Sequence, residues 1–197
     1  MREPMRGLSL VVAARLATHL SLASLASLTG CGGKGAVGPG RDYPRYVGHA
    51  AELFDDGIDP ISVGYQLEPG PAPATDTKLR ERVQTGDAIV RARVVTVTSK
   101  NEDAGRSWQL GLHTLARLAG TGPLDDDFTL EVGSTDPGAG MVRAFESRLV
   151  GATFVVAVRT FAHPGAAGEA DLHFHVLADR SDVLAAIREA SLLQQVK

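Results

Sequence analysis

Residues 88–98 restrict the fold of this chain more than any other part of the sequence. The run Ala-Ile-Val-Arg-Ala-Arg-Val-Val-Thr-Val-Thr is rich in β-branched side chains, which favour extended backbone. Within it Val90, Ala92 and Val94 alternate with Arg91 and Arg93, which predicts a strand with one buried and one solvent-facing side. After Val94 both sides become apolar, as in a long strand that bends. Because an isolated strand is not stable in water, this run requires a sheet.

Four later segments have the same character and are separated by Gly, Pro and polar turn residues. They are Ser107–Leu115, Phe128–Val132, Phe154–Phe161 and Asp171–Leu177, with a Gly/Pro loop expected at Gly133–Gly140. Two helices flank the strands. Thr77–Thr85 stops at Gly86, and Ser181–Gln195 carries a Ser cap and an apolar stripe. The sequence therefore predicts a mainly β fold with a short leading helix and a C-terminal helix.

The spacing of these five strands resembles that of OB-type barrels, and is closer to that of the netrin-like and metalloproteinase-inhibitor modules. The shared features are a long first strand (Asp87-Ala88-Ile89-Val90), a Gly-containing segment after the second strand (Leu118-Ala119-Gly120) and a Leu-Val-Gly turn (Leu149-Val150-Gly151) before Phe154. The resemblance covers about residues 87–177 and implies a small five-stranded OB-like barrel. The disulfides common in the animal modules are absent, because the chain has a single Cys, so an inhibitory role is not carried over.

The first 30 residues are typical of a secretory signal peptide. Arg2 and Arg6 form a short basic region, and the chain from Leu8 to Leu28 is rich in Leu, Val, Ala and Ser without an acidic residue. Arg15 and His19 interrupt the apolar run. If translation starts at Met5 instead of Met1, the basic region extends to Arg15 and the apolar region begins after it.

The tetrapeptide Leu28-Thr29-Gly30-Cys31 resembles the lipobox of bacterial lipoproteins. The resemblance implies that a diacylglycerol is attached to the Cys31 sulfur and that cleavage leaves Cys31 as the first mature residue. Two or three acyl chains hold a protein on a bilayer durably, whereas one does so only marginally. Gly32 after the Cys is similar to lipoproteins sorted to the outer membrane. The alternative is an incidental thiol at the end of an ordinary signal peptide.

Between this leader and the strands, composition predicts two further regions. Residues 31–45 comprise the lipidated Cys31 and a flexible tether, centred on the Gly-rich stretch 32–40. Residues 46–86 form an irregular arm that contains a helical turn at His49–Phe54, an extended Pro-rich segment at Glu68–Thr75 and the short helix Thr77–Thr85. Residues 87–197 form the β-barrel domain with its C-terminal helix.

Candidate chemistry centres on three histidines. His173 and His175 alternate with Leu172, Phe174 and Val176, which predicts that both imidazoles project from one face of a strand about 7 Å apart. With His163 across the hairpin they form a candidate Zn²⁺ or Cu²⁺ site, since imidazole suits both metals. The simpler interpretation is an outward polar face. Asp55-Asp56-Gly57-Ile58-Asp59 lacks the spacing of a calcium loop and is interpreted as a solubilising acidic turn.

These observations predict a lipid-anchored, non-enzymatic binding or structural module of the bacterial cell envelope, at the outer membrane. Its partners would be the membrane, through acyl chains on Cys31, and an envelope protein or ligand that the sequence does not identify. No cofactor is expected. The net charge of −3 argues against a nucleic-acid partner, which requires clustered positive charge. The alternative function is a metal-binding protein or metal-dependent enzyme that uses His163, His173 and His175.

Overall fold

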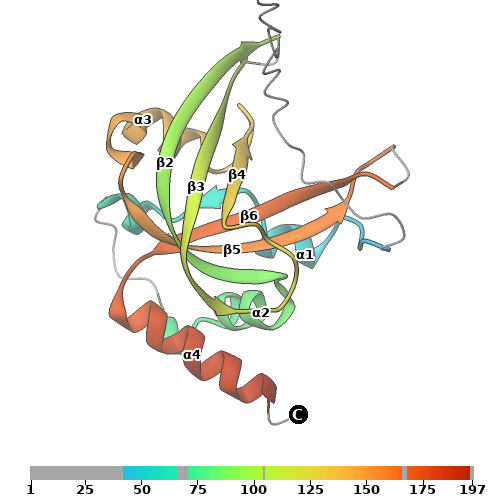
Figure 1. Ribbon diagram of the computed structural model, residues 1–197, viewed down its shortest axis with the longest axis vertical. Coiled ribbons are helices and arrows are strands. Elements are labelled where there is room, and N and C mark those ends of the chain that lie inside the picture. The colour runs from blue at the N-terminus through green and yellow to red at the C-terminus, as the bar shows by residue number, and fades with distance from the viewer. Residues whose placement is uncertain (1–41, 66–70, 104, 166–167, 196–197) are drawn as a thin grey trace, which may run out of the picture. The chain divides into compact units, whose positions relative to one another are not determined.

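The computed structural model describes residues 42–65, 71–103, 105–165 and 168–195 (Figure 1). The predicted signal peptide, Cys31 and the Gly-rich stretch of the predicted tether lie outside these residues. The described part contains a six-stranded mixed sheet in the order β1-β6-β5-β2-β3-β4. Its strands are β1 (Gly57–Ile58), β2 (Ala88–Glu102), β3 (Gly105–Ala119), β4 (Asp127–Val132), β5 (Thr153–Ala162) and β6 (Ala170–Ala178).

The five strands expected from the sequence are all present, and the mainly β character is confirmed. The helices α2 (Thr77–Thr85) and α4 (Ser181–Gln195) have the predicted bounds. The Asp76 side chain caps α2 by accepting a hydrogen bond from the Leu79 backbone N–H at 3.2 Å. The predicted turn at His49–Phe54 is the short helix α1 (His49–Leu53).

The prediction of a five-stranded OB-like barrel is wrong. The sheet has six strands and stays open, with β1 at one edge and β4 at the other. The sixth strand comes from the arm: Gly57 and Ile58 pair in parallel with His175 and Val176 of β6. The extended Pro-rich segment is also partly wrong, because Pro73–Thr75 forms a single turn of 3₁₀ helix, η2; a second, η1, spans Pro60–Val63.

The sheet is strongly curved although it does not close. The long hairpin β2–β3 contains three register shifts, the last between Val94 and Thr96, and such bulges increase local twist. Strand β5 pairs with β2 only from Ala88 to Arg93, so the far half of the hairpin bends away from β5 (Figure 1). As a result β4 comes near β6 across the concave side. Curvature rather than closure brings β4 toward β6.

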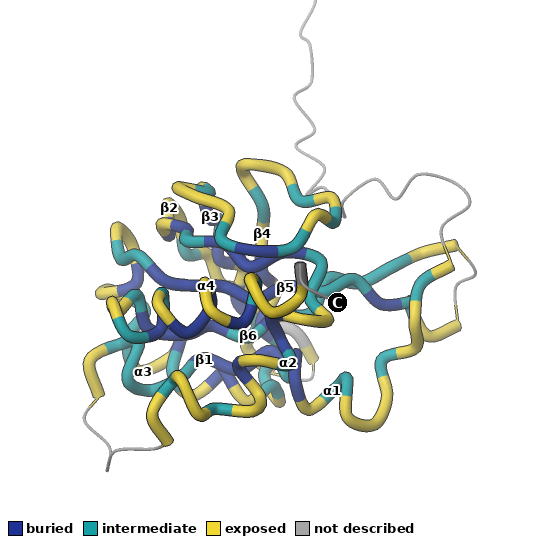
Figure 2. Tube along the Cα trace, turned by 90° about the horizontal axis from the view of Figure 1, so that it is seen from below, coloured by how far each residue is buried: buried dark blue, intermediate teal, exposed yellow. Residues whose placement is uncertain are grey.

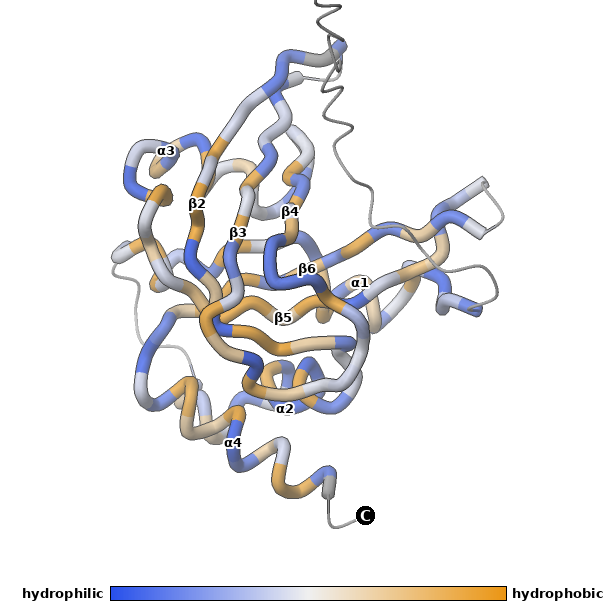
Figure 3. The backbone as a smooth tube through the Cα atoms, viewed as in Figure 1, coloured by the Kyte–Doolittle hydropathy of each residue, from blue (hydrophilic) through white to orange (hydrophobic). Residues whose placement is uncertain are grey.

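Each face of the sheet has its own hydrophobic core. On the concave face, Trp108, Leu112, Val156 and Phe174 pack with the helix α3 (Ala139–Leu149). On the opposite face, side chains of β5 and β6 pack under α1, α2 and α4. Figure 2 shows this buried interior beneath an exposed surface, and Figure 3 shows the apolar colouring concentrated along β5. Strand β5 is therefore covered on both faces, which fits the continuous apolar run from Phe154 to Val158.

Helix α3 was not predicted. It begins inside the expected Gly/Pro loop, at Ala139, with Gly138 as its N-cap and no capping side chain. Gly140 lies in its first turn, so the usual sequence signals for a helix start are missing. The buried positions Ala139, Val142 and Leu149 are spaced as one helical face, and packing on the concave core stabilises the helix despite these weak signals. Among the described residues, no helix is both long enough and apolar enough to cross a bilayer.

Candidate functional site: a histidine–carboxylate clasp

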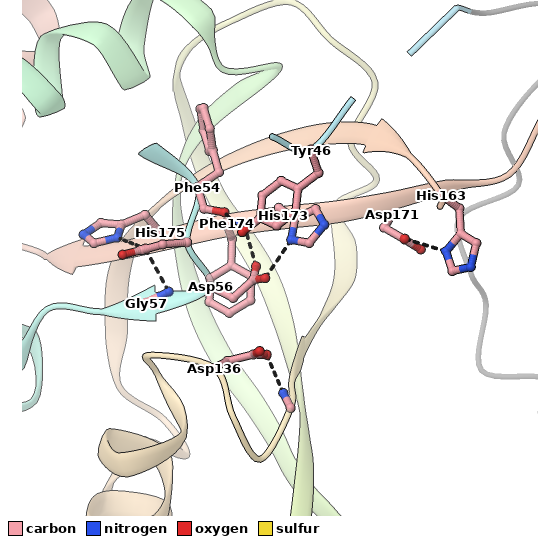
Figure 4. A network of polar contacts seen from close by, with 12 residues as sticks. Tyr46, Phe54, Asp56, Gly57, Asp136, His163, Asp171, His173, Phe174 and His175 are labelled. Atoms are coloured by element: carbon pink, nitrogen blue, oxygen red, sulfur yellow. Dashed lines mark hydrogen bonds and ion pairs between the residues drawn. The ribbon is translucent and has the colours of Figure 1, made fainter. Parts of the chain in front are cut away.

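The arm is fastened to β6 by paired histidine and carboxylate side chains (Figure 4). His173 Nδ1 lies 2.6 Å from Asp56 Oδ2, and His175 Nδ1 lies 2.7 Å from Asp55 Oδ1. Because a carboxylate only accepts, each imidazole donates from Nδ1 and leaves Nε2 for other contacts. We call the set Tyr46, Asp55, Asp56, His173 and His175 the clasp.

Strand alternation explains why both histidines face the arm. Phe174 and Val176 point into the concave core, so His173 and His175 point to the opposite face, where Tyr46 stacks on His173 and Asp55 bonds to His175. Their side chains are only 18% and 16% exposed. The interpretation of this face as an outward polar surface is therefore wrong, because the arm that covers it is distant in sequence.

Asp56 has the most demanding position in the clasp. It is buried, and its φ of 54° lies in the left-handed region, which Asp tolerates better than most residues. Its backbone N–H donates to the Phe174 carbonyl at 2.9 Å, and its Oδ1 accepts from the Phe174 N–H at 3.0 Å. Its own carbonyl accepts from the N–H of Gly138 at 3.1 Å. Asp56 thus joins the arm, β6 and the start of α3.

The pKa values of the two carboxylates are shifted in opposite directions. Burial raises the pKa of Asp56, and the hydrogen bond and charge of His173 do not fully offset it. Burial also acts to raise the pKa of Asp55, but the hydrogen bond from His175, its charge and the charge of Arg82 outweigh burial, so this pKa is lowered. The difference follows from depth, because Asp56 is the more deeply buried of the two.

An aromatic ring covers the histidine of the His173–Asp56 pair. Tyr46 stacks on the His173 imidazole with ring centroids 3.5 Å apart and planes 5° from parallel. The Tyr46 hydroxyl donates to the Phe54 carbonyl at 2.8 Å. Burial, together with the negative charges of Asp56 and Asp55, raises the pKa of Tyr46 to about 12, so this hydroxyl stays protonated as the donor.

A buried arginine of α2 binds the end of α1, next to the acidic residues of the clasp. Arg82 of α2 is 4% exposed and donates from Nε to the Leu53 carbonyl at 2.6 Å, which satisfies the C-terminal end of α1. Burial lowers the pKa of Arg82, and the charge of Asp55 partly offsets this. Within the arm, the segment from Leu53 to Asp56 is therefore held by α2 on one side and by β6 on the other.

The three predicted histidines do not converge. His163 follows the last residue of β5, and its Nδ1 lies 2.5 Å from Oδ2 of Asp171 in β6. Asp171 lies two residues before His173 on β6, about 7 Å along the strand, and each of the three imidazoles is bonded to a different carboxylate. In the described ranges, no group of three or more His, Cys, Asp or Glu side chains is placed to hold a metal ion. The metal-site hypothesis therefore receives no geometric support.

Sequence reasoning missed the carboxylates of the clasp. The segment Asp55–Asp59 was interpreted as a solubilising turn, whereas Asp56 is buried and Asp55 is bonded to His175. A signal was present: Leu53, Phe54 and Ile58 flank the acidic pair, and an acidic pair between apolar residues indicates burial with a partner. The sequence could not identify that partner, because His173 and Asp56 are 117 positions apart.

Comparison with protein-family models, with curated proteins and with solved structures found no match to this chain.

Proposed function

We propose that this protein is a lipid-anchored, non-enzymatic binding or structural module of the bacterial cell envelope, located at the outer membrane. The observation that carries the proposal is the leader that ends in Leu28-Thr29-Gly30-Cys31. Acyl chains on Cys31 would hold the mature chain on the bilayer. The partner that it binds there is an envelope protein or ligand.

The geometry of the clasp supports a structural role for the most conspicuous polar side chains. Each histidine is hydrogen-bonded to its own carboxylate, and the pairs His173–Asp56 and His175–Asp55 join the arm to β6. The arm is the part of the chain that follows the proposed anchor. A firm attachment of the arm to the sheet suits a module that is held at one end.

The anchor is tested by labelling cells with a fatty acid that carries a click-chemistry handle and comparing wild type with Cys31→Ser. Wild type is expected to incorporate the label and to sediment with membranes, and mass spectrometry should find an acylated Cys31 as the amino terminus. Cys31→Ser should lose the label and leave the membrane fraction after a mild wash. Ser27→Ala is the matched control, because it alters the same apolar region and keeps the Cys. A bare thiol at Cys31 in mature wild type would overturn the anchor.

The metal-binding alternative has a separate test. Titration of the protein with Zn²⁺ or Cu²⁺ should give no saturable binding that depends on His163, His173 or His175. Micromolar or tighter binding that is lost in His173→Ala would revive the alternative and contradict the structural role of the clasp.

A further inference from the structure

A cavity of about 140 Å³ lies between η1, α3 and the start of β5. Most of its lining is apolar: Val63, Phe145, Leu149, Ala152 and Phe154. Leu149 and Phe154 belong to the concave core, so the cavity reaches from the surface into buried apolar surroundings. An apolar cavity of about 150 Å³ holds a benzene-sized molecule, so a single ring or a branched chain of four to five carbons is the scale that fits.

Two polar side chains complete the lining, and only one of them has donors to offer. The Ser62 hydroxyl already donates to the Asp59 carbonyl at 2.6 Å, which leaves its oxygen as an acceptor. Arg148 lies over the ring of Phe145, with Cζ 5.9 Å from the ring centroid. Within the described part of the chain, Arg148 forms no ion pair and no hydrogen bond. A guanidinium with free donors at the edge of an apolar cavity selects for an anion.

We infer that this cavity binds a small monocarboxylate with an aromatic or branched aliphatic body. The apolar body occupies the space between Val63, Leu149 and Phe154, and the carboxylate accepts from Arg148. This inference names a ligand class for the proposed binding role and does not depend on the anchor. The positive charge of Arg148 excludes a cation of the same shape. An uncharged ring offers no acceptor to the N–H donors of Arg148.

Ligand-observed NMR titration of the purified full-length protein with benzoate tests the inference, with benzylammonium and toluene as matched probes. Benzoate is expected to bind saturably, benzylammonium not at all, and toluene more weakly than benzoate. Arg148→Gln should weaken benzoate binding by about tenfold or more, because it removes a charge-assisted contact. Arg188→Gln, an exposed arginine on α4, should leave the affinity unchanged.

A second variant tests the apolar part of the cavity. Ala152→Leu places a larger side chain in the space and should abolish benzoate binding, with folding checked by circular dichroism. Arg148 is exposed, so Arg148→Gln should fold like wild type. This variant therefore tests the inference even if Ala152→Leu does not fold. Equal binding of benzoate to wild type and Arg148→Gln, or no saturable binding to wild type, would overturn the inference. Cys31→Ser should bind benzoate like wild type, which separates failure of the anchor from failure of the cavity.

Discussion

At the scale of single residues, Asp56 is the position on which most contacts of the clasp depend. Its side chain receives a hydrogen bond from His173 and one from the Phe174 N–H, and its backbone is in the left-handed region. Any substitution must therefore satisfy buried donors and tolerate a positive φ. Few side chains meet both demands.

Asp56→Ala is expected to lower the free energy of unfolding by about 2–4 kcal/mol, because it leaves buried donors unpaired and strains the backbone. Asp56→Asn keeps an acceptor for Phe174 and tolerates the left-handed region, so it should recover most of this loss at neutral pH. Asp127→Ala is the matched control, since it removes a histidine partner in an exposed pair with His113 and should cost less than about 1 kcal/mol. Urea unfolding measures all three; equal losses for Asp56→Ala and Asp127→Ala would contradict the assigned role.

The opposite pKa shifts of Asp55 and Asp56 predict opposite pH dependences. The native state raises the pKa of Asp56, so the stabilisation from its proton is present below the ordinary value of 3.8 and is lost as pH rises through the native pKa. The native state lowers the pKa of Asp55, so its stabilisation is present above 3.8 and is lost as pH falls through the native pKa.

Unfolding measured between about pH 3 and pH 6 checks these signs. Relative to wild type, the stability deficit of Asp56→Asn should shrink as pH rises, and that of Asp55→Asn should grow. Parallel curves for the two variants would show that the carboxylates are not tuned differently.

At the scale of elements, α3 depends on a close approach between two backbones. A Cβ on Gly138 would lie 2.6 Å from the Asp56 carbonyl oxygen, whereas a Cβ on Gly140 would meet nothing within 4 Å. The N-cap of α3 therefore has to be a residue without a side chain. The requirement comes from the arm and not from the helix itself.

Gly138→Ala should destabilise the protein by about 1–3 kcal/mol, because the arm and α3 must separate to admit the methyl group. Gly140→Ala, two residues away in the same helix, should be neutral or stabilising by up to about 1 kcal/mol, since Ala is the better helix former. Thermal unfolding of both variants is the measurement, and a destabilising Gly140→Ala with a neutral Gly138→Ala would refute the packing described.

At the scale of the whole described fold, two cores share one sheet, and α4 covers the second. Ile187 is fully buried against that face, whereas Leu192, one and a half turns later, is 61% exposed. Ile187→Ala should lower the free energy of unfolding by about 2–5 kcal/mol through lost burial and a cavity. Leu192→Ala should change it by less than about 0.5 kcal/mol. Chemical denaturation of the two variants compares them, and similar effects would mean that α4 is not a core element.

Local pattern predicted those elements whose signals lie within a few neighbouring residues. Alternation of Val90, Ala92 and Val94 indicated β2, and Gly86 indicated the end of α2. The sequence did not predict that the sheet stays open. Closure would require β4 to pair with β1, and this depends on the total curvature that the bulges in β2–β3 produce. The two-residue strand β1 was not predicted either, since no periodicity can appear in two residues.

The positions of β2 to β6 along the chain and the bounds of α2 and α4 were determined by the sequence alone, because each follows from residues close together in the chain. The tertiary structure decided the partners. His173 and His175 acquired their carboxylates, and Phe145 and Arg148 acquired a cavity, only when segments distant in the sequence came together. The physical reason is that a side chain's periodicity sets the face on which it lies, whereas the charge and burial that it experiences are set by the element covering that face.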